Sequence, residues 1–367
     1  MSLLLAYRRW WCFFFMAVLT LPTLGLVLPD LPGPVRLMTT PQERWWVHAT
    51  ERLDPFINGR YGFRGLIMAG NATYLRAMKS TRERPVLLGE GGQMFFTGEQ
   101  TLEQSLGRLF RIKPMTELAD TLARLNAALK ARGAKLVVSS PPNAATVLPE
   151  KLPAWARGQM THPTELDFLT EQMEKRGIAH VDLRPLLIAA KAQGPVFRRT
   201  DTHWNQRSSV LAFNAMMAAA GRPDLEIAPD SAIGPLRDAP SGDLARYLGE
   251  ANPTGDKDYG EIASNPKPVL TPLKGLMPER PADDPFQPYA YATGHAGPSI
   301  LVIGDSFSQH YWPRLLERVA SRFAWMHHSA CKFEWPAVER FKPDLVIYMV
   351  TERSLPCRGQ PIGMPPG

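Results

Sequence analysis

Residues Ser299–Ser308 read Ser-Ile-Leu-Val-Ile-Gly-Asp-Ser-Phe-Ser, an apolar run that stops at a small polar turn. Residues 300–303, which are apolar and rich in β-branched side chains, predict a fully buried strand. The apolar spacing of residues 315–319 predicts a helix soon afterwards. Ser306 therefore lies at a strand-to-helix turn, where backbone N–H groups can stabilise a developing oxyanion. The glycine before the turn lets a substrate approach the backbone closely. These features make Ser306 a candidate nucleophile.

A candidate base for this serine lies far upstream, in the segment Arg199-Thr200-Asp201-Thr202-His203-Trp204. Each motif alone has an ordinary structural interpretation, because Gly-Asp-Ser turns are common in α/β folds. Asp201 is also suited to cap the helix that we expect from Asn205 to Ala220. Together, however, Ser306, His203 and Asp201 supply a nucleophile, a general base and a carboxylate that orients the base. The pair of motifs therefore points to acyl chemistry.

The order of the remaining elements predicts the fold class. Apolar runs at residues 135–140, 178–183 and 344–350 predict further strands, and helical periodicity fills most of the chain between them. This alternation indicates an α/β fold, a doubly wound and mainly parallel sheet, in which ligands bind at the carboxyl ends of the strands. The predicted helices are residues 102–131, 164–175, 185–192 and 205–220, and a hairpin is expected at residues 86–96.

One long segment breaks this alternation. Residues 221–297 are rich in Pro, Gly and Asp and show clear local order only at residues 242–248. A segment of this length without periodicity predicts an irregular excursion across the active-site edge of the sheet.

The N-terminus carries an apolar segment. Residues 10–28 are almost wholly apolar and follow Arg8 and Arg9. At about 1.5 Å per residue they come close to spanning a bilayer core of ~30 Å. The arginines predict that residues 1–9 stay in the cytoplasm and that the rest is exported. We favour an uncleaved transmembrane anchor; a cleaved signal peptide is the alternative. Residues 29–80 are expected to form a stalk and helical lead-in, and residues 81–367 the catalytic domain.

Composition narrows the possible ligands. The net charge is +7, from 42 Lys and Arg against 35 Asp and Glu, and the basic residues are spread along the chain. That distribution argues against nucleic acid and is compatible with an anionic polymer. No Cys/His spacing resembles a zinc site, and we expect neither metal nor cofactor. Cys12 lies in the apolar segment, which leaves Cys331 and Cys357 as either a disulfide or two unrelated thiols.

The two motifs resemble those of a known protein family. Asp201-Thr202-His203-Trp204 and Gly304-Asp305-Ser306-Phe307-Ser308 resemble the SGNH-hydrolase-like domain of the alginate O-acetyltransferases, the AlgJ and AlgX type. Supporting stretches are Leu87-Leu88-Gly89, Met94-Phe95-Phe96, Pro149-Glu150-Lys151-Leu152-Pro153, Ser241-Gly242-Asp243-Leu244 and Glu352-Arg353. The resemblance extends over residues 50–355.

The resemblance implies transfer of acetyl groups to an extracellular polysaccharide. It assigns Ser306 as nucleophile, His203 as general base and Asp201 as the residue that orients His203. It implies an acetyl donor delivered by a multi-span membrane O-acyltransferase and a polysaccharide secretion complex as partners. It also implies a bacterial inner-membrane protein with a single-pass anchor and a periplasmic catalytic domain.

Two positions depart from the family. Members often have an aromatic residue where Gln93 stands and a lysine where Asn143 stands. If these side chains contact substrate, the acceptor need not be alginate. Asn143, at the end of a predicted strand, is also a candidate second oxyanion donor.

Several other side chains are candidate substrate contacts. Trp204 and Tyr311 are suited to pack against a sugar ring, and each is equally suited to the core. Arg199 or Arg353 is suited to pair with an acidic sugar carboxylate, or with a structural ion-pair partner. His310, four residues after Ser306, is an alternative base, although its position favours the following helix.

The same three residues would serve two other functions. A carbohydrate esterase would use them to remove acetyl groups. A non-catalytic assembly factor would bind polysaccharide and leave them idle. The sequence leaves transfer, hydrolysis and binding open.

Overall fold

The computed structural model describes residues 10–17, 19–20, 70, 84–252, 254–265 and 267–364. The chain divides into two compact units: Met1–Arg84 with Arg246–Ala251, and Pro85–Ala245 with Asn252–Gly367. In the first unit, residues 10–17 and 19–20 are helical and exposed. None of the helices in the described ranges is long and apolar enough to cross a membrane. Residues 1–9, 18 and 21–28 of the predicted N-terminus and anchor, and nearly all of the predicted stalk, lie outside the described residues.

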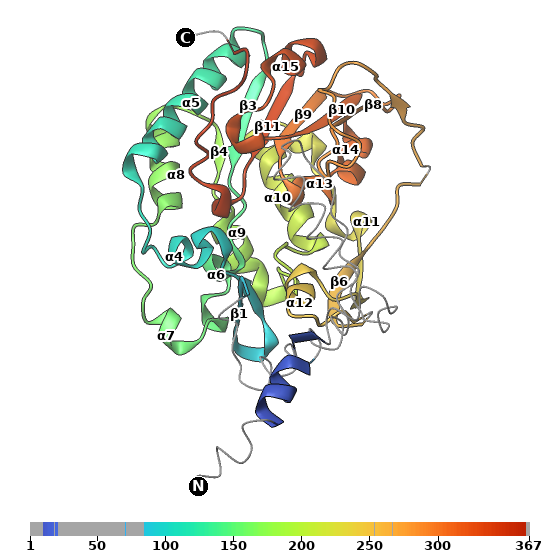
Figure 1. Cartoon of the computed structure of the whole chain (residues 1–367). Coiled ribbons are helices and arrows are strands. Elements are labelled where there is room, and N and C mark those ends of the chain that lie inside the picture. Colours follow the sequence, from blue (N-terminus) through green and yellow to red (C-terminus); the bar gives the residue numbers. More distant parts are fainter. Residues whose placement is uncertain are drawn as a thin grey trace. The chain divides into compact units, whose positions relative to one another are not determined.

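The second unit contains a seven-stranded sheet in the order β4-β3-β11-β9-β10-β8-β7 (Figure 1). Five neighbouring strands, from β4 to β10, are parallel, β8 runs antiparallel to β10, and β7 runs antiparallel to β8. The mainly parallel sheet that the sequence predicts is therefore present. The strands are β3 (Lys135–Ser139), β4 (His180–Val181), β7 (Thr271–Pro272), β8 (Tyr289–Ala292), β9 (Ser299–Gly304), β10 (Arg322–His327) and β11 (Leu345–Met349).

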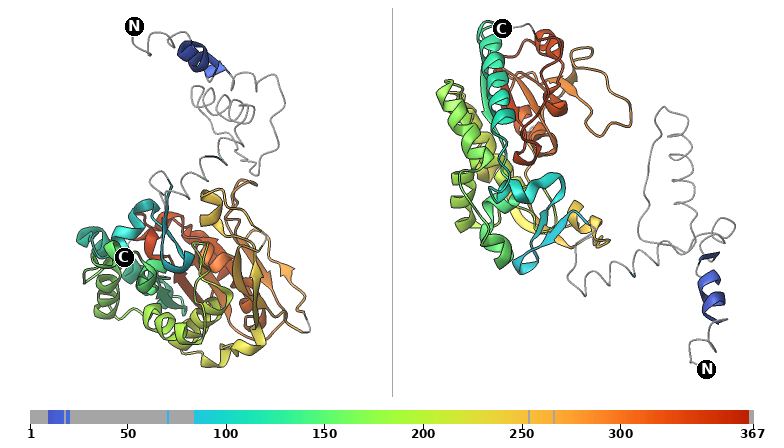
Figure 2. Two further views of the ribbon diagram at one scale, coloured as in Figure 1. Left: turned by 90° about the horizontal axis from the view of Figure 1, so that it is seen from below. Right: turned by 60° about the vertical axis from the view of Figure 1, so that its left-hand side comes forward.

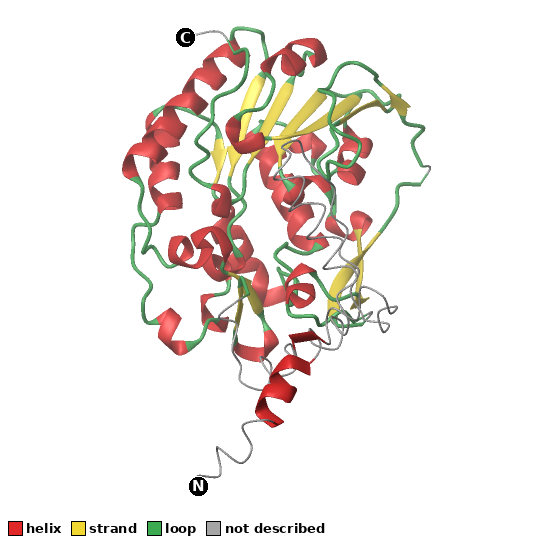
Figure 3. Cartoon of the chain, viewed as in Figure 1, coloured by secondary structure: helices red, strands yellow, loops and turns green. Residues whose placement is uncertain are grey.

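Helices cover both faces of this sheet (Figure 3). Strand β9 shows why: Ile300 and Val302 pack into one core, and Leu301 and Ile303 pack into the other. All four are fully buried, and each buried side chain of this size stabilises the fold by ~1.5–3 kcal/mol. One core contains residues of α9 (Leu183–Ala190), α10 (Gln206–Ala219) and α14 (Pro313–Val319). The other contains residues of α5 (Ile112–Lys130), α8 (Glu165–Lys175) and α15 (Trp335–Phe341), with α5 and α8 side by side (Figure 2).

Helix starts follow local capping chemistry. Thr164 and Asp167 form a capping box at the start of α8, and the Asn205 side chain accepts from the Ser208 amide at the start of α10. Because Asn205 caps α10, Asp201 is not the cap that the sequence left as an alternative. Its carboxylate is available for His203.

Two predicted elements need correction. The helix expected over residues 102–131 is two helices, α4 (Thr101–Ser105) and α5. Between them Gly107 adopts φ +70° and lies so close to Thr161 O that a Cβ would be 2.1 Å away. The strand expected over residues 178–183 shortens to β4, because Asp182 caps α9 through the Arg184 amide.

The excursion at residues 221–297 is more ordered than its composition predicts. Strands β5 (Ile233–Ala239) and β6 (Asp256–Glu261) form an antiparallel pair, and β7 and β8 extend the main sheet. The predicted hairpin of β1 (Val86–Leu88) and β2 (Met94–Phe96) is confirmed. The remaining short helices are α6 (Ala144–Val147), α7 (Ala154–Arg157), α11 (Pro229–Ala232), α12 (Asp243–Tyr247) and α13 (Ser306–Gln309).

A disulfide joins Cys331 and Cys357, whose Cα atoms are 5.4 Å apart. Cys331 follows the carboxyl end of β10, and Cys357 follows that of β11. The bond therefore ties together two segments at the edge of the sheet where ligands bind in such folds. Cys12 is a free, exposed cysteine.

Candidate active site

Ser306 is the first residue of α13, directly beyond β9. Strand β9 ends at Gly304, where a Cβ would come within 2.3 Å of Ser308 Oγ, so only glycine fits. The Asp305 side chain accepts from the Phe307 amide and caps the helix. The turn leaves Ser306 half-buried, and its amide has no hydrogen-bond acceptor among the described residues.

Asp305 also fixes this turn to the neighbouring strand. Its second carboxylate oxygen accepts from the amide and the hydroxyl of Thr351, both at 2.9 Å. Thr351 follows β11, so the carboxyl ends of β9 and β11 are joined directly beneath Ser306.

The predicted base lies next to the predicted nucleophile. His203 Nε2 is 2.8 Å from Ser306 Oγ, and His203 Nδ1 is 2.6 Å from Asp201 Oδ1. The His203 amide also donates to Asp201 Oδ1 at 3.0 Å. The carboxylate therefore holds the imidazole so that Nε2 can take the serine proton, which is the geometry of a catalytic triad.

The catalytic loop, residues 198–203, is closed at its base by the antiparallel bridge between Phe197 and Trp204. Gln93 and the hairpin strand β2 support it from one side. Gln93 Nε2 donates to Arg198 O at 3.2 Å, and the Met94 amide donates to Arg199 O at 2.8 Å. Gln93 therefore braces the loop, which is a structural role for this departure from the family.

Two aspartates of the excursion support the loop from the other side. Asp256 accepts from the amides of Arg199 and Thr200, at 3.0 and 2.8 Å. Asp243 accepts from the amide and the hydroxyl of Thr202, at 2.8 and 2.6 Å. Neither role is predictable from the sequence: Asp243 lies in the stretch Ser241-Gly242-Asp243-Leu244 that resembles the family, whereas Asp256 belongs to no motif.

The charge of Asp201 is stabilised from two directions. Burial alone would raise its pKa, but the hydrogen bonds and charge of His203, together with the charge of Arg198, hold the pKa well below its ordinary value. Asp201 is therefore ionised at neutral pH and available to stabilise an imidazolium.

Three carboxylate and imidazole groups lie close enough together to resemble a metal site. The donor atoms of Asp201, His203 and Asp243 lie within 4.8 Å of one another. Each already has a protein partner, since Asp201 binds His203 and Asp243 binds Thr202. This hydrogen bonding accounts for the cluster without an ion.

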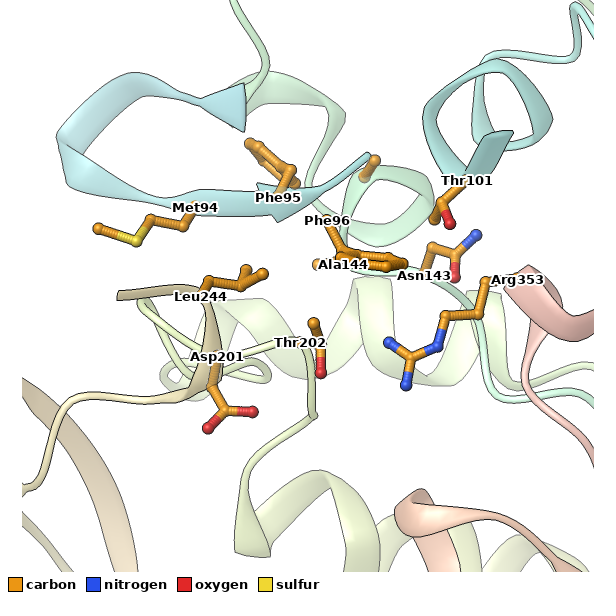
Figure 4. A pocket seen from close by; sticks show the side chains of 11 residues that line it. Met94, Phe95, Phe96, Thr101, Asn143, Ala144, Asp201, Thr202, Leu244 and Arg353 are labelled. Atoms are coloured by element: carbon orange, nitrogen blue, oxygen red, sulfur yellow. The ribbon is translucent and has the colours of Figure 1, made fainter. Parts of the chain in front are cut away.

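A pocket lies beside the catalytic loop (Figure 4). Its walls are mostly apolar, and its charged groups are Asp201 and Arg353. The Arg353 guanidinium lies 5.5 Å from the Phe96 ring and 5.4 Å from the Phe307 ring, and among the described residues it has no ion-pair partner. It is thus an unpaired cation next to the residue that follows Ser306. The lining residues are Met94, Phe95, Phe96, Thr101, Asn143, Ala144, Ala145, Asp201, Thr202, Leu244 and Arg353.

The structure corrects the expectation that Trp204 contacts sugar. Trp204 is fully buried, and its indole N–H donates to Phe307 O at 3.2 Å. Tyr311 donates its hydroxyl to Trp204 O at 2.9 Å, so its polar end is bonded within the protein. These two side chains connect the helix after Ser306 with the loop that carries His203.

The other predicted contacts are placed differently. Asn143 lines the pocket, but its side-chain amide donates to Ser105 Oγ at 3.0 Å. Arg199 is exposed and donates to Gly255 O at 3.0 Å. The His310 ring lies 5.5 Å from the His203 ring. The His310 amide donates to the Ser306 backbone carbonyl at 3.4 Å, whereas the Ser306 hydroxyl contacts His203 Nε2.

The sequence of this chain is similar to those of known proteins. The model of the family described as "SGNH hydrolase-like domain, acetyltransferase AlgX" matches residues 86–322, well over half of the chain. The chain belongs to this family. It is also similar to the probable alginate O-acetylase AlgJ of Pseudomonas syringae pv. tomato, with 35% identity over 136 residues. That match spans 35% of this chain and 34% of the relative, about a third of the relative's length.

The fold of this chain is also similar to the folds of solved structures. PatB1 of Bacillus cereus, determined with a sulfonyl adduct, matches 78% of this chain and 100% of its own, with a TM-score of 0.56 and 13% identity. The O-acetyltransferase domain of Pseudomonas putida AlgJ matches 76% and 94%, with a TM-score of 0.47 and 21% identity. At such identities the PatB1 likeness supports the α/β fold alone.

Gly242 offers a test of the loop geometry. A Cβ at this position would lie 2.3 Å from Asp201 Cβ and 2.5 Å from Thr200 O. We expect Gly242→Ala to displace Asp201 and to lower kcat for cleavage of an activated acetyl ester by about 100-fold, the loss typical of a ~1 Å misplacement. Steady-state kinetics and thermal unfolding of the variant measure the two effects separately.

Gly158→Ala is the matched control, because Gly158 has helical φ and ψ and its Cβ would meet only Ala154 O at 3.4 Å. Full activity of Gly242→Ala would mean that the position of Asp201 does not matter for the reaction.

Proposed function

We propose that this protein is an O-acetyltransferase that adds acetyl groups to hydroxyls of an acidic, alginate-like extracellular polysaccharide. The observation that carries the proposal is the hydrogen-bonded chain from Asp201 through His203 to Ser306, with links of 2.6 and 2.8 Å. Membership of the acetyltransferase family supports the acetyl group as cargo. The similarity to an alginate O-acetylase supports the polymer class.

In the first half-reaction, Ser306 Oγ attacks the carbonyl carbon of an activated acetyl ester. His203 Nε2 takes the hydroxyl proton, and Asp201 stabilises the imidazolium. The oxyanion is stabilised by backbone amides near Ser306, each worth ~3 kcal/mol in the transition state. The intermediate collapses, the leaving oxygen takes the proton from His203, and an acetyl ester on Ser306 remains.

In the second half-reaction, His203 removes the proton from a sugar hydroxyl. The sugar oxygen attacks the acetyl-serine carbonyl, the bond to Ser306 Oγ breaks, and His203 returns the proton to the serine. Water competes with the sugar at this step, so transfer requires a well-held acceptor and a site from which water is largely excluded.

The unpaired Arg353 provides such a hold for an acidic acceptor. Its guanidinium is directed toward Thr202 (Figure 4) and lies 5.5 Å from the Phe96 ring and 5.4 Å from the Phe307 ring. A guanidinium without a protein carboxylate favours binding of a uronic acid carboxylate, through charge-assisted hydrogen bonds. Asn143 and the exposed Arg199 remain candidate contacts, Arg199 for a second carboxylate along the polymer.

The reaction also needs a location and a donor. We propose that residues 10–28 anchor the chain in the bacterial inner membrane and that the catalytic domain lies in the periplasm, based on the apolar run after Arg8 and Arg9. We further propose that a multi-span membrane O-acyltransferase delivers the acetyl group, within a polysaccharide secretion complex.

A transfer assay tests the proposed activity. The full-length protein, an activated acetyl ester and an acidic oligosaccharide should yield acetylated oligosaccharide, detected by mass spectrometry. Ser306→Ala should reduce the rate by at least ~1,000-fold, because the nucleophile is gone. Ser231→Ala, in which only a helix-end hydrogen bond to Ala228 O is lost, should retain the rate.

The outcomes separate the alternatives. Ester cleavage without acetylated oligosaccharide would identify an esterase. No turnover by wild type, with oligosaccharide bound, would favour a non-catalytic assembly factor.

Arg353→Gln tests the acidic acceptor. We expect the ratio of kcat/KM for an acidic over a neutral oligosaccharide to fall about 10-fold, since a charge-assisted hydrogen bond contributes ~1.5–3 kcal/mol. Arg132→Gln is the control, because Arg132 pairs with Glu339 on the surface. An unchanged ratio in Arg353→Gln would rule out pairing between Arg353 and the acceptor carboxylate.

A further inference from the structure

Arg198 contacts the side of Asp201 that faces away from His203. Its Nη1 donates to Asp201 Oδ2 at 2.9 Å, and its Nη2 donates to Pro240 O at 2.6 Å. His203 occupies the other carboxylate oxygen, Oδ1. Both oxygens of Asp201 are therefore bound, one to the general base and one to a cation.

The Arg198 side chain is only 16% exposed and lies among three carboxylates. Besides Asp201, it faces Asp256 and Asp258 of β6, each with a carboxylate oxygen 3.9 Å from Nε. This Nε is buried without a hydrogen-bond acceptor. The guanidinium therefore donates its hydrogen bond to Asp201. The carboxylates of Asp256 and Asp258 lie near its Nε and balance part of its positive charge.

We propose that Arg198 is a positioning residue of the acetyl-transfer reaction, which holds the Asp201 carboxylate against His203 and balances part of its charge. The inference rests on the proposed function, because it assigns Arg198 a part in the same triad. It adds a fourth member to the hydrogen-bonded chain, in the order Arg198, Asp201, His203 and Ser306.

Two physical effects follow from this contact. The first is orientation: with Oδ2 fixed to Arg198, rotation of the Asp201 carboxylate away from the His203 ring would break a charge-assisted hydrogen bond. The second is electrostatic: the positive charge of Arg198 offsets part of the Asp201 carboxylate charge that faces His203.

Other titratable groups also lie near His203. Asp243 Oδ2 lies 3.9 Å from His203 Nδ1, and the His310 ring lies 5.5 Å from the His203 ring. Asp256 and Asp258 face Arg198 rather than His203. Removal of Arg198 would leave Asp201, Asp256 and Asp258 close together without their shared cation, and this added negative charge favours a protonated His203.

Arginine suits this position better than lysine would. The guanidinium reaches Asp201 and Pro240 O with two separate nitrogens of one rigid plane. An ammonium supplies the charge but not this fixed pair of donors. The two substitutions Arg198→Met and Arg198→Lys therefore separate the orienting effect from the charge effect.

The test is the pH dependence of acetyl ester turnover by the full-length protein. For Arg198→Met we expect kcat to fall about 10-fold with KM little changed, well short of the ~10,000-fold that follows from disabling a triad carboxylate. The acid limb of the kcat/KM profile should move up by about one pH unit, because its base is easier to protonate. For Arg198→Lys we expect a smaller loss of kcat and an acid limb close to that of wild type.

Arg184→Met is the matched control, since Arg184 is a half-buried arginine whose carboxylate partners are Asp167 and Asp182. It should leave the acid limb where wild type has it. All rates are normalised to the folded fraction from thermal unfolding.

An unchanged acid limb in Arg198→Met, or kcat equal to wild type per folded molecule, would overturn the proposal. If Arg198→Met does not fold, Arg198→Lys decides: full kcat per folded molecule would reduce Arg198 to a structural ion pair. Failure of the proposed function itself appears differently, as wild type without any acetyl ester turnover.

Discussion

The site depends on one constraint: a six-residue loop, residues 198–203, must hold His203 against a turn that lies in a different part of the chain. The link is the 2.8 Å contact between His203 Nε2 and Ser306 Oγ. No residue of the loop belongs to a helix or to a strand of the main sheet. Its backbone groups are instead held by Asp256, by Asp243 and by the β1–β2 hairpin. The loop is thus fixed by hydrogen bonds from elements that carry no catalytic group.

The nucleophile side is fixed by a different mechanism. The fully buried strand β9 delivers Ser306 to the carboxyl edge of the sheet, and Asp305 links this turn to Thr351 beyond β11. Trp204 and Tyr311 then join the two sides, because Trp204 donates to Phe307 O and accepts from Tyr311 through its own carbonyl. These contacts give both aromatic residues a structural role in joining the two motifs.

The sequence predicts the parts of the site that rest on strong local signals. An apolar run before Gly-Asp-Ser indicates a buried strand with a serine at the turn that follows it, and Asp-x-His indicates a base with its carboxylate. It does not predict Arg198, Asp243 or Asp256 as supports, since their roles arise from contacts between distant segments. The strands β5 and β6 were missed for a related reason. Most of their residues are exposed or half-exposed, so neither shows the alternation of a strand with one buried face.

Burial explains the remaining differences between the roles that the sequence predicts and those that the structure shows. Arg199 and Trp204 flank the same motif at its two ends. Trp204 is fully buried, whereas Arg199 is exposed to solvent. Sequence alone cannot assign these opposite environments, because both side chains suit a sugar site and both suit a structural role. The setting of Arg353 likewise emerges only from the structure, which places two aromatic rings beside the guanidinium and no ion-pair partner among the described residues.

The central claim is that Ser306 carries the acetyl group between donor and acceptor. The most direct measurement is the intact mass of the full-length protein after brief exposure to an activated acetyl ester, followed by peptide mapping. The account predicts a single acetyl adduct on Ser306 that an acidic oligosaccharide discharges faster than buffer does. An adduct on another residue, or turnover of the ester without any dependence on Ser306, would contradict it.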